Sequence, residues 1–446
     1  MLGTGLGVYI PVALYVAFLV GCLLSIAWRP TIGLYILILV MPQQRLRSYI
    51  SDMPLGKHII LLLLLAILIG VLIRGQSVRP SKLNKILIVF VVFTFISLCW
   101  GALNPYLSSP TLERFYHWKD YMMLPGFFFA ASASIRTRKD FTTALVLICL
   151  SVLLVGRSFA LEIRQHDFSH FDENKRDSGP LGLGSNNTAA FEAQMSLFLL
   201  ALVGSLKKRS IKLLLYGSLG LSVFCLLFAF SRGAYIGFLA GLIALALVKR
   251  PILVPIGLVL LLAWQTVLPV AVVERITMTE DEGGQLEESA ASRVELWKDA
   301  LDLIAANPLF GSGYDTYEYM GRIGSLRDTH NFYVKATVET GLIGLLIFLA
   351  ILAKFFQMGW TLFRRTEDSM FSSLGLGMVL CTICLAIVNL FGDRWTYLEV
   401  NGLVWALFGL AAYAHYELDS VALAAAQKTS VPGILAAFAE RTLSRV

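Results

Sequence analysis

Two arginines and a histidine in this 446-residue chain have the side-chain chemistry that a diphosphate substrate needs. Arg232 lies in "FSRGAYIG" between two apolar runs, Arg293 lies in the first turn of an expected amphipathic helix, and His330 lies in "DTHNFY" just before another apolar run. A guanidinium binds phosphate oxygens through two parallel hydrogen bonds. An imidazole titrates near neutral pH and can take a proton from a hydroxyl. The three residues therefore predict a diphosphate site with a general base beside it.

Each residue has a simpler explanation when it is taken alone. Arg232 could reach lipid headgroups, Arg293 could be an ordinary solvated side chain, and His330 could be a hydrogen-bonded histidine at the membrane interface. A transporter of a lipid-linked glycan would also use arginines to hold diphosphate, but it calls for charged groups near the bilayer midplane and paired repeats. The charged candidates here gather at the ends of apolar runs, which favours an enzyme.

Other polar residues near the ends of apolar runs are weaker candidates. Asp393 and Arg394, in "FGDRWTY", form either a structural ion pair or a pair that binds substrate and orients His330. Arg114, His117 and Lys119 form an aromatic-basic cluster that is typical of a membrane-interface anchor, although it could also meet acceptor phosphates.

Two polar segments are expected to be structural. Asn186 and Asn187 precede an apolar run and suit a helix cap. The segment "HDFSH" (166–170) with Asp172 contains possible metal ligands, but no helix is evident to align them. We therefore expect neither a metal ion nor a cofactor.

The residues that must position these groups are mostly apolar. The chain is 57% hydrophobic and only 15% charged, which leaves too little polar surface for a water-soluble protein of this length. The apolar runs approach the ~20 residues that cross a bilayer as helix, and they lack the alternation of a membrane barrel. The sequence predicts an all-α polytopic membrane protein. We expect residues 1–446 to form one integral membrane domain. The first run lacks the flanking signals of a signal peptide, so we expect it to be retained.

Hydropathy predicts about twelve transmembrane helices. The uncertain region is the start, where "WRP" (28–30) is either a tight turn or an interruption in one long helix. The expected spans are 8–27, 31–42, 57–73, 86–102, 121–134, 141–157, 187–205, 213–230, 234–248, 251–272, 335–356, 371–391 and 401–415.

Lysines and arginines recur at every second connection, which sets the orientation because short basic loops stay in the cytoplasm. The segments between them are then extracytoplasmic, and they carry the candidate residues. The chain's net charge of +7 reflects this topology and does not indicate nucleic-acid binding. The basic loops are 74–85, 136–139, 207–212, 249–250 and 364–365, and the outer segments are 158–186, 231–233, 274–334 and 392–400.

The longest outer loop, 274–334, is acidic and partly helical in pattern. It holds twelve Asp or Glu residues against five Lys or Arg. From 289 to 306 the apolar residues Val294, Trp297, Leu301 and Ile304 recur at helical spacing, and Ser292 with Glu295 could cap the start. Asn307-Pro308 should end this helix, which we expect to lie on the outer membrane surface.

Three ordered motifs resemble the O-antigen ligase and polymerase superfamily of bacterial envelope enzymes. They are "SRGAYIGFLAGL" (231–242), "SRVELWKDALDLIAANPLFGSGYDTY" (292–317) and "THNFYVKATVETGLIGLLIFL" (329–349). Their counterparts in the family are a Ser-Arg-Gly at a helix start, an Arg-x-x-x-Trp helix leading to Pro-x-x-Gly-x-Gly, and a His-Asn-x-Tyr before a glycine-containing helix. The motifs cover about 120 residues.

The resemblance implies a metal-independent, inverting glycosyltransferase of the membrane-embedded (GT-C-like) class. Its donor would be a glycan on undecaprenyl diphosphate, used at the periplasmic face of the inner membrane among membrane lipids. By this resemblance Arg232 and Arg293 hold the diphosphate and His330 activates the acceptor.

The motifs leave the acceptor open. The glycan could go to lipid A-core, as in a ligase, to another lipid-linked repeat, as in a polymerase, or to a protein hydroxyl, as in an O-oligosaccharyltransferase. The single large outer loop and the chain length favour the ligase. The final "ERTLSRV" is basic, so we expect the C-terminus in the cytoplasm.

Overall fold

The computed structural model describes residues 9–103, 111–176, 179–249, 251, 255, 262–278, 288–320 and 329–443, and every regular element in these ranges is helical. Short 3-10 turns η1 to η5 connect some of the helices. The helices are α1 (Tyr9–Ala27), α2 (Pro30–Val40), α3 (Gln44–Ser48), α4 (Ile59–Ile73), α5 (Lys82–Ala102), α6 (Thr111–Ser134), α7 (Arg138–Ile163), α8 (Ser185–Leu202), α9 (Arg209–Phe228), α10 (Arg232–Lys249), α12 (Trp264–Val267), α13 (Val270–Thr277), α14 (Glu288–Ala306), α15 (Phe332–Arg365), α16 (Ser369–Val388) and α17 (Leu398–Leu443).

Eight helices in the described part of the chain are long and apolar enough to cross a membrane, rather than the twelve or so predicted from hydropathy alone. The predicted spans in α2, α6, α8 and α17 are helical but are not among the eight. Helix α2 has only 11 residues, and α6 and α8 carry several polar side chains. The eight are 9–27, 56–73, 82–102, 138–163, 209–228, 232–249, 332–365 and 369–391.

The predicted span 251–272 is described only at 251, 255 and 262–272, and its end is wrong. Helix α12 ends at Val267, and a separate amphipathic helix, α13, begins at Val270, directly after Pro269. Proline cannot continue the preceding helix because it lacks a backbone N–H.

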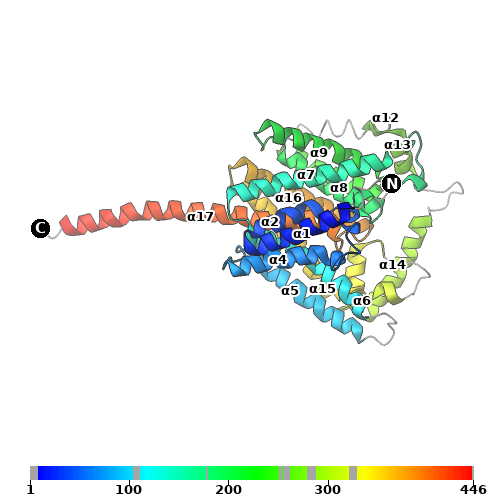
Figure 1. The fold of residues 1–446 in the computed structure, drawn as a ribbon, viewed down its shortest axis with the longest axis horizontal. Helices are drawn as coiled ribbons and strands as arrows, with labels where there is room; N and C mark the ends of the chain where they lie inside the picture. Colours follow the sequence, from blue (N-terminus) through cyan, green and yellow to red (C-terminus); the bar gives the residue numbers. More distant parts are fainter. Residues whose placement is uncertain are drawn as a thin grey trace.

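The helices run roughly side by side in one bundle, and α17 leaves it at the end opposite to α13 and α14 (Figure 1). Helix α16 packs against α15, α8 and α10, while α17 packs against α6. Nearly every residue of α8 and most residues of α16 are buried, as is α17 from Val400 to Ala414. These three helices form the interior on which the other helices pack.

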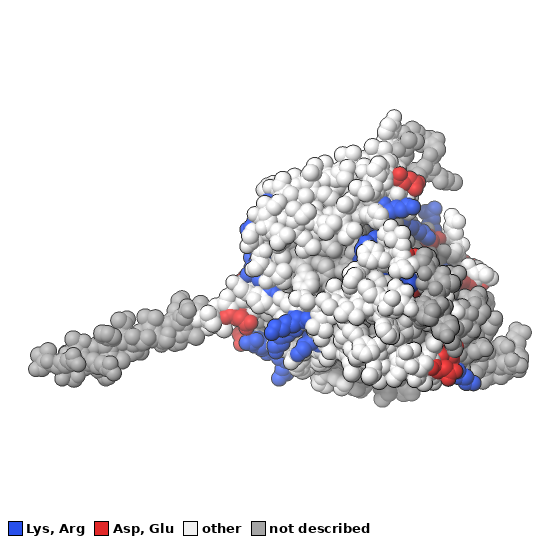
Figure 2. Space-filling view, turned by 90° about the horizontal axis from the view of Figure 1, so that it is seen from below, with Lys and Arg blue, Asp and Glu red and all other residues white. Residues whose placement is uncertain are grey.

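Three of the predicted basic loops, 74–85, 136–139 and 364–365, form contacts at the end where α17 leaves the bundle. Arg138 forms an ion pair with Asp368, Arg365 forms one with Asp419 of α17, and the Arg79 guanidinium lies over the Tyr416 ring. The predicted grouping is therefore confirmed for these three connections. Figure 2 shows charged side chains gathered toward the two ends of the molecule with a broad uncharged band between them, as a membrane protein requires.

The break at "WRP" separates two helices. Helix α1 ends at Ala27, and Pro30 occupies the first turn of α2, where its missing N–H costs nothing. Arg74 donates to the carbonyls of Ile26 and Trp28 and thereby satisfies the end of α1. The tight-turn alternative is the correct one.

Helix α15 is broken in its first third, and the preceding loop fills the break. Gly341 has φ +67°, outside the helical region. The N–H groups of Ser312 and Gly313 donate to the carbonyls of Val338 and Glu339, and the N–H of Leu342 donates to Pro308. The glycine-containing motif at 308–313 is thus a plug that satisfies the backbone groups freed by the kink.

Helix α14 differs from its prediction at the start. It begins at Glu288, so Ser292 is not its cap and Arg293 lies in the second turn instead of the first. It ends at Ala306, as Asn307-Pro308 predicted. From Leu296 on, where burial is described, its buried residues are Leu296 and Ala300. They pack with Tyr317 and Val338, so the face turned to the protein is shifted by one residue from the predicted stripe.

Candidate active site

Arg232 is the first residue of α10. The chain reverses direction within a few residues between the end of α9 and this position. Helix α9 ends at Phe228, and Phe230 adopts φ +52°, a left-handed conformation that lets the chain reverse tightly. An added Cβ on Gly233 would lie 2.7 Å from the Phe391 side chain, so only glycine allows this close approach. The Arg232 side chain donates to the carbonyl of Met278, at the end of α13.

Arg232, Arg275 and Arg394 line one cavity of about 250 Å³, which we name the arginine cavity. These residues come from α10, α13 and the turn before α17. Asn186, Ser231 and Phe391 complete much of the wall, and no Asp or Glu is among the described residues that line it. Three guanidinium groups thus converge from segments that are distant in sequence.

Like Arg232, the other two arginines are oriented by hydrogen bonds to neutral oxygens. Arg275 is buried, donates from Nε to the Phe230 carbonyl at 3.4 Å and lies over the Phe171 ring. Arg394 donates from Nη1 to Asn187 Oδ1 at 2.8 Å. Such fixed geometry suits recognition of phosphate oxygens.

A fourth arginine lies next to this cavity. Arg176 Nη2 donates to Asn186 Oδ1 at 2.9 Å and Nη1 donates to Glu173 at 3.1 Å. Burial and the nearby positive charge of Arg275 lower the pKa of the Arg176 guanidinium. Asn186 and Asn187 are therefore not caps, because α8 already begins at Ser185 and both side chains hold arginines.

Clustered cations in a partly buried site repel one another, and an anion relieves that repulsion. Two adjacent phosphates offer enough oxygens for several guanidinium forks at once. The arginine cavity is consequently suited to a diphosphate.

His330 and Arg293 lie on segments that contact each other. Trp297 of α14 donates from Nε1 to the Thr329 carbonyl at 2.9 Å, one residue before His330. Arg293 is one turn before Trp297 in the same helix, and nothing further is described of its side chain. His330 has φ +51°, and Asn331 caps α15 by accepting from the N–H of Tyr333 and Val334. Neither His330 nor Arg293 is among the described lining residues of the arginine cavity.

Asp393 is held by Lys335 and the turn at residues 392–397. It accepts from Lys335 Nζ at 3.1 Å, Thr396 Oγ1 at 2.7 Å and the N–H of Trp395 at 3.0 Å. Burial alone would raise the pKa of the Asp393 carboxyl, but Lys335 and Thr396 outweigh it and hold the pKa below its usual value. Asp393 thus fixes the turn that carries Arg394 and links it to α15.

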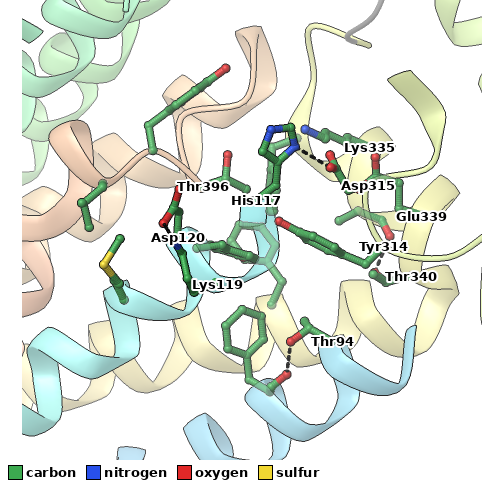
Figure 3. A pocket seen from close by; sticks show the side chains of 18 of the residues that line it. Thr94, His117, Lys119, Asp120, Tyr314, Asp315, Lys335, Glu339, Thr340 and Thr396 are labelled. Atoms are coloured by element: carbon green, nitrogen blue, oxygen red, sulfur yellow. Dashed lines mark hydrogen bonds and ion pairs between the residues drawn. The ribbon is translucent and has the colours of Figure 1, made fainter. Parts of the chain in front are cut away.

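A second cavity, of about 360 Å³, lies at α15 on the side of Lys335, and we name it the mixed-charge cavity. Figure 3 shows His117, Asp315, Lys335 and Glu339 around it, with the ring of Tyr314 between them. Its size is typical of small-molecule sites. Thr396 of the 392–397 turn also lines it, so this turn contributes residues to both cavities.

Within the aromatic-basic cluster at 114–119, Arg114 faces the protein, while Tyr116 and His117 are exposed. Arg114 is buried and donates to the Tyr314 carbonyl, His117 Nδ1 lies 2.7 Å from Asp315 Oδ2, and Lys119 forms an ion pair with Asp120. The interface-anchor interpretation is therefore wrong for Arg114. His117 and Lys119 line the mixed-charge cavity.

Of the residues predicted from sequence, the structure brings Arg232 and Arg394 into one cavity. Arg275 and Arg176 were missed. Arg275 follows Pro269 in the amphipathic segment "VAVVERIT", and an arginine on such a segment, at the start of the predicted outer loop, was the available signal.

The fold and the two cavities define a polytopic membrane protein with an arginine-rich pocket at the end opposite to the basic loops. Residues 217–349 match the family model described as O-antigen ligase, a domain that O-antigen ligases and polymerases share. This stretch includes Arg232, Arg293 and His330, and the match confirms the resemblance over these motifs. A search of curated proteins found no match.

Proposed function

We propose that this protein is an O-antigen ligase. It moves a glycan from undecaprenyl diphosphate to lipid A-core at the periplasmic face of the bacterial inner membrane, in lipopolysaccharide biosynthesis. The observation that carries the proposal is the convergence of Arg232, Arg275 and Arg394 in one cavity, within and next to a stretch that matches the O-antigen ligase family.

The arginines would supply the main catalytic effect. As the bond between the anomeric carbon and the diphosphate oxygen breaks, the electron pair stays with the diphosphate, and fixed cations stabilise that charge. Arg232 would grip the diphosphate through two hydrogen bonds, Arg293 would approach it from α14, and Arg275 and Arg394 would complete the binding site. No metal ion is then needed to meet the developing charge.

His330 would act on the acceptor. The acceptor hydroxyl oxygen attacks the anomeric carbon from the face opposite to the diphosphate, which inverts the configuration there. Its proton passes to the His330 imidazole as the new glycosidic bond forms. The contact between Trp297 and the Thr329 carbonyl supports this assignment, because it ties the segment that carries His330 to the helix that carries Arg293.

Reconstitution tests the activity directly. Purified protein in lipid nanodiscs, supplied with the lipid-linked glycan and with lipid A-core, should form a glycan-capped core and release undecaprenyl diphosphate. Longer lipid-linked chains without any capped core would identify a polymerase instead. Movement of the donor across a sealed membrane without a new glycosidic bond would identify a transporter.

A deletion strain gives an independent answer in cells. Loss of a ligase should leave core without long chains while lipid-linked polymer accumulates, and gel profiling of the envelope glycans measures both. Core capped with a single unextended unit would contradict the ligase assignment and favour the polymerase.

A further inference from the structure

Glu339 stands out among the residues that line the mixed-charge cavity. It lies in α15, two residues before the kink at Gly341, and is only 3% exposed. Its Oε1 atom has no hydrogen-bond partner among the described residues, yet the side chain lines the cavity. Buried carboxylate oxygens are normally hydrogen-bonded, and an unmet one is costly. This oxygen is therefore available to a donor on a bound ligand.

The charges around the cavity indicate what kind of ligand that is. Asp315, Glu318 and Glu399 line it together with Lys57, Lys119 and Lys335. Carboxylates on the wall repel a diphosphate, and in this respect the cavity differs from the arginine cavity. Because positive and negative side chains both line it, the cavity does not favour a strongly charged ligand of either sign. A neutral molecule with many hydroxyls can use both kinds of group, because a hydroxyl donates to carboxylates and accepts from ammonium groups.

Aromatic rings form another part of the wall. Tyr121 and Tyr314 stack with centroids 6.0 Å apart, and Phe332 and Phe348 pack edge to face at 4.8 Å. All four residues line the cavity. Apolar faces next to a few convergent polar groups are the usual composition of a ligand site, and a sugar ring offers both kinds of surface.

We propose that the mixed-charge cavity binds a sugar residue of the acceptor glycan and that Glu339 accepts a hydrogen bond from one of its hydroxyls. This inference rests on the proposed function. The acceptor is favoured over the donor because the cavity includes Phe332 and Lys335, within one turn or so of His330, and contains no arginine of the diphosphate site. Lys335 and Asp393 join the two cavities across the 392–397 turn.

The test measures the two substrates separately on the full chain in nanodiscs, with lipid A-core as the acceptor probe. Glu339→Gln keeps the shape but replaces one carboxyl oxygen by an NH2 group, which cannot accept a hydrogen bond from the ligand. Its KM for lipid A-core should rise by about tenfold to a hundredfold, while its KM for the lipid-linked donor stays unchanged. Direct binding of lipid A-core without donor should weaken by the same factor.

Glu367→Gln is the matched control, because Glu367 is exposed in the turn after α15 at the other end of the bundle. It should leave both KM values unchanged. A Glu339→Gln protein with normal acceptor KM and binding would overturn the subsite, as would a rise in the donor KM alone. If the unaltered protein neither binds nor modifies lipid A-core, the proposed function fails instead.

Discussion

His330 has a role at the residue scale that differs from that of the arginines. A base acts on the acceptor hydroxyl in the transition state and contributes little to holding the donor. The backbone around His330 is fixed by the Asn331 cap and by the Trp297 hydrogen bond to Thr329, so a substitution of the ring should leave the segment in place.

We therefore expect His330→Ala to lower turnover by about 10²- to 10⁴-fold while donor affinity stays near normal. Initial rates and donor binding of the purified variant measure the two effects. His166→Ala is a control, because it removes another histidine of a predicted outer segment, and His166 lines neither cavity. A His330→Ala enzyme within a few-fold of normal turnover would contradict the assignment.

The His117 and Asp315 pair makes stability depend on pH. The hydrogen bond from His117 to Asp315 is the largest effect on this histidine and raises its pKa above 6.5 in the folded protein. A raised pKa means that the folded state binds the proton more tightly, so the stabilisation is complete below pH ~6.5 and is lost as pH rises through the folded-state pKa.

The pair thus predicts a pH-dependent difference in melting temperature between the unaltered protein and His117→Gln. The unaltered protein should melt at the higher temperature in mildly acid buffer, and the difference should shrink as the pH is raised through neutrality. Thermal unfolding in detergent across that range measures it. A difference that grows with pH would have the wrong sign for this pair.

At the scale of elements, the kink of α15 and its plug depend on glycine. A Cβ on Gly341 would lie 2.1 Å from the Leu309 carbonyl oxygen, and φ of +67° is unfavourable for other residues. Gly311 and Gly313 have positive φ as well, and an added Cβ would lie 2.6 Å from the backbone of α15 at Gly311 and 2.2 Å from that of α5 at Gly313. Since the kink lies next to Glu339, its geometry also shapes the mixed-charge cavity.

Gly341→Ala should destabilise the protein by about 1–3 kcal/mol from backbone strain, and by more if the plug is displaced. Gly220→Ala is its matched control, because Gly220 lies in α9 with open space around its Cα. Thermal or denaturant unfolding of both variants should separate them clearly. Equal stability of the two would mean that the plug does not hold the kink.

Sequence reasoning predicted most helices well, because apolar runs of the length needed to cross a bilayer are a strong signal. It also predicted Arg232 and Arg394 as candidates, because each charge interrupts or borders such a run. It could not predict the partnership of Arg394 with Asn187, or of Arg275 with Phe230, because these contacts join segments far apart in the chain. The kink at Gly341 could not be predicted either, because Thr340 and Gly341 lie within an apolar run whose pattern is typical of a continuous helix.

At the scale of the whole molecule, the two ends of the bundle must lie on opposite sides of the membrane. His170 and Glu274 pair at the end that carries the arginine cavity, and Arg138 and Asp368 pair at the other. The basic connections belong in the cytoplasm by the positive-inside rule, so the arginine cavity should face outward.

Cysteine labelling tests this orientation in intact cells. In a background without the six native cysteines, Ser169→Cys should react with a membrane-impermeant thiol reagent, whereas Ser77→Cys and Ser210→Cys should react only after permeabilisation. All three positions are exposed, unlike Ser312, which is buried and would report poorly from either side. The reverse pattern would move the site to the cytoplasm.

The central claim is that the arginine cavity holds the donor diphosphate, and donor affinity tests it most directly. Binding of the lipid-linked glycan to purified Arg232→Lys, Arg275→Lys and Arg394→Lys should weaken by about tenfold to a hundredfold each, because lysine keeps the charge but loses the two-pronged hydrogen bond. Arg209→Lys, at an exposed position on the opposite end, should bind normally. Unchanged donor affinity in all three cavity variants, with folding intact, would contradict the account.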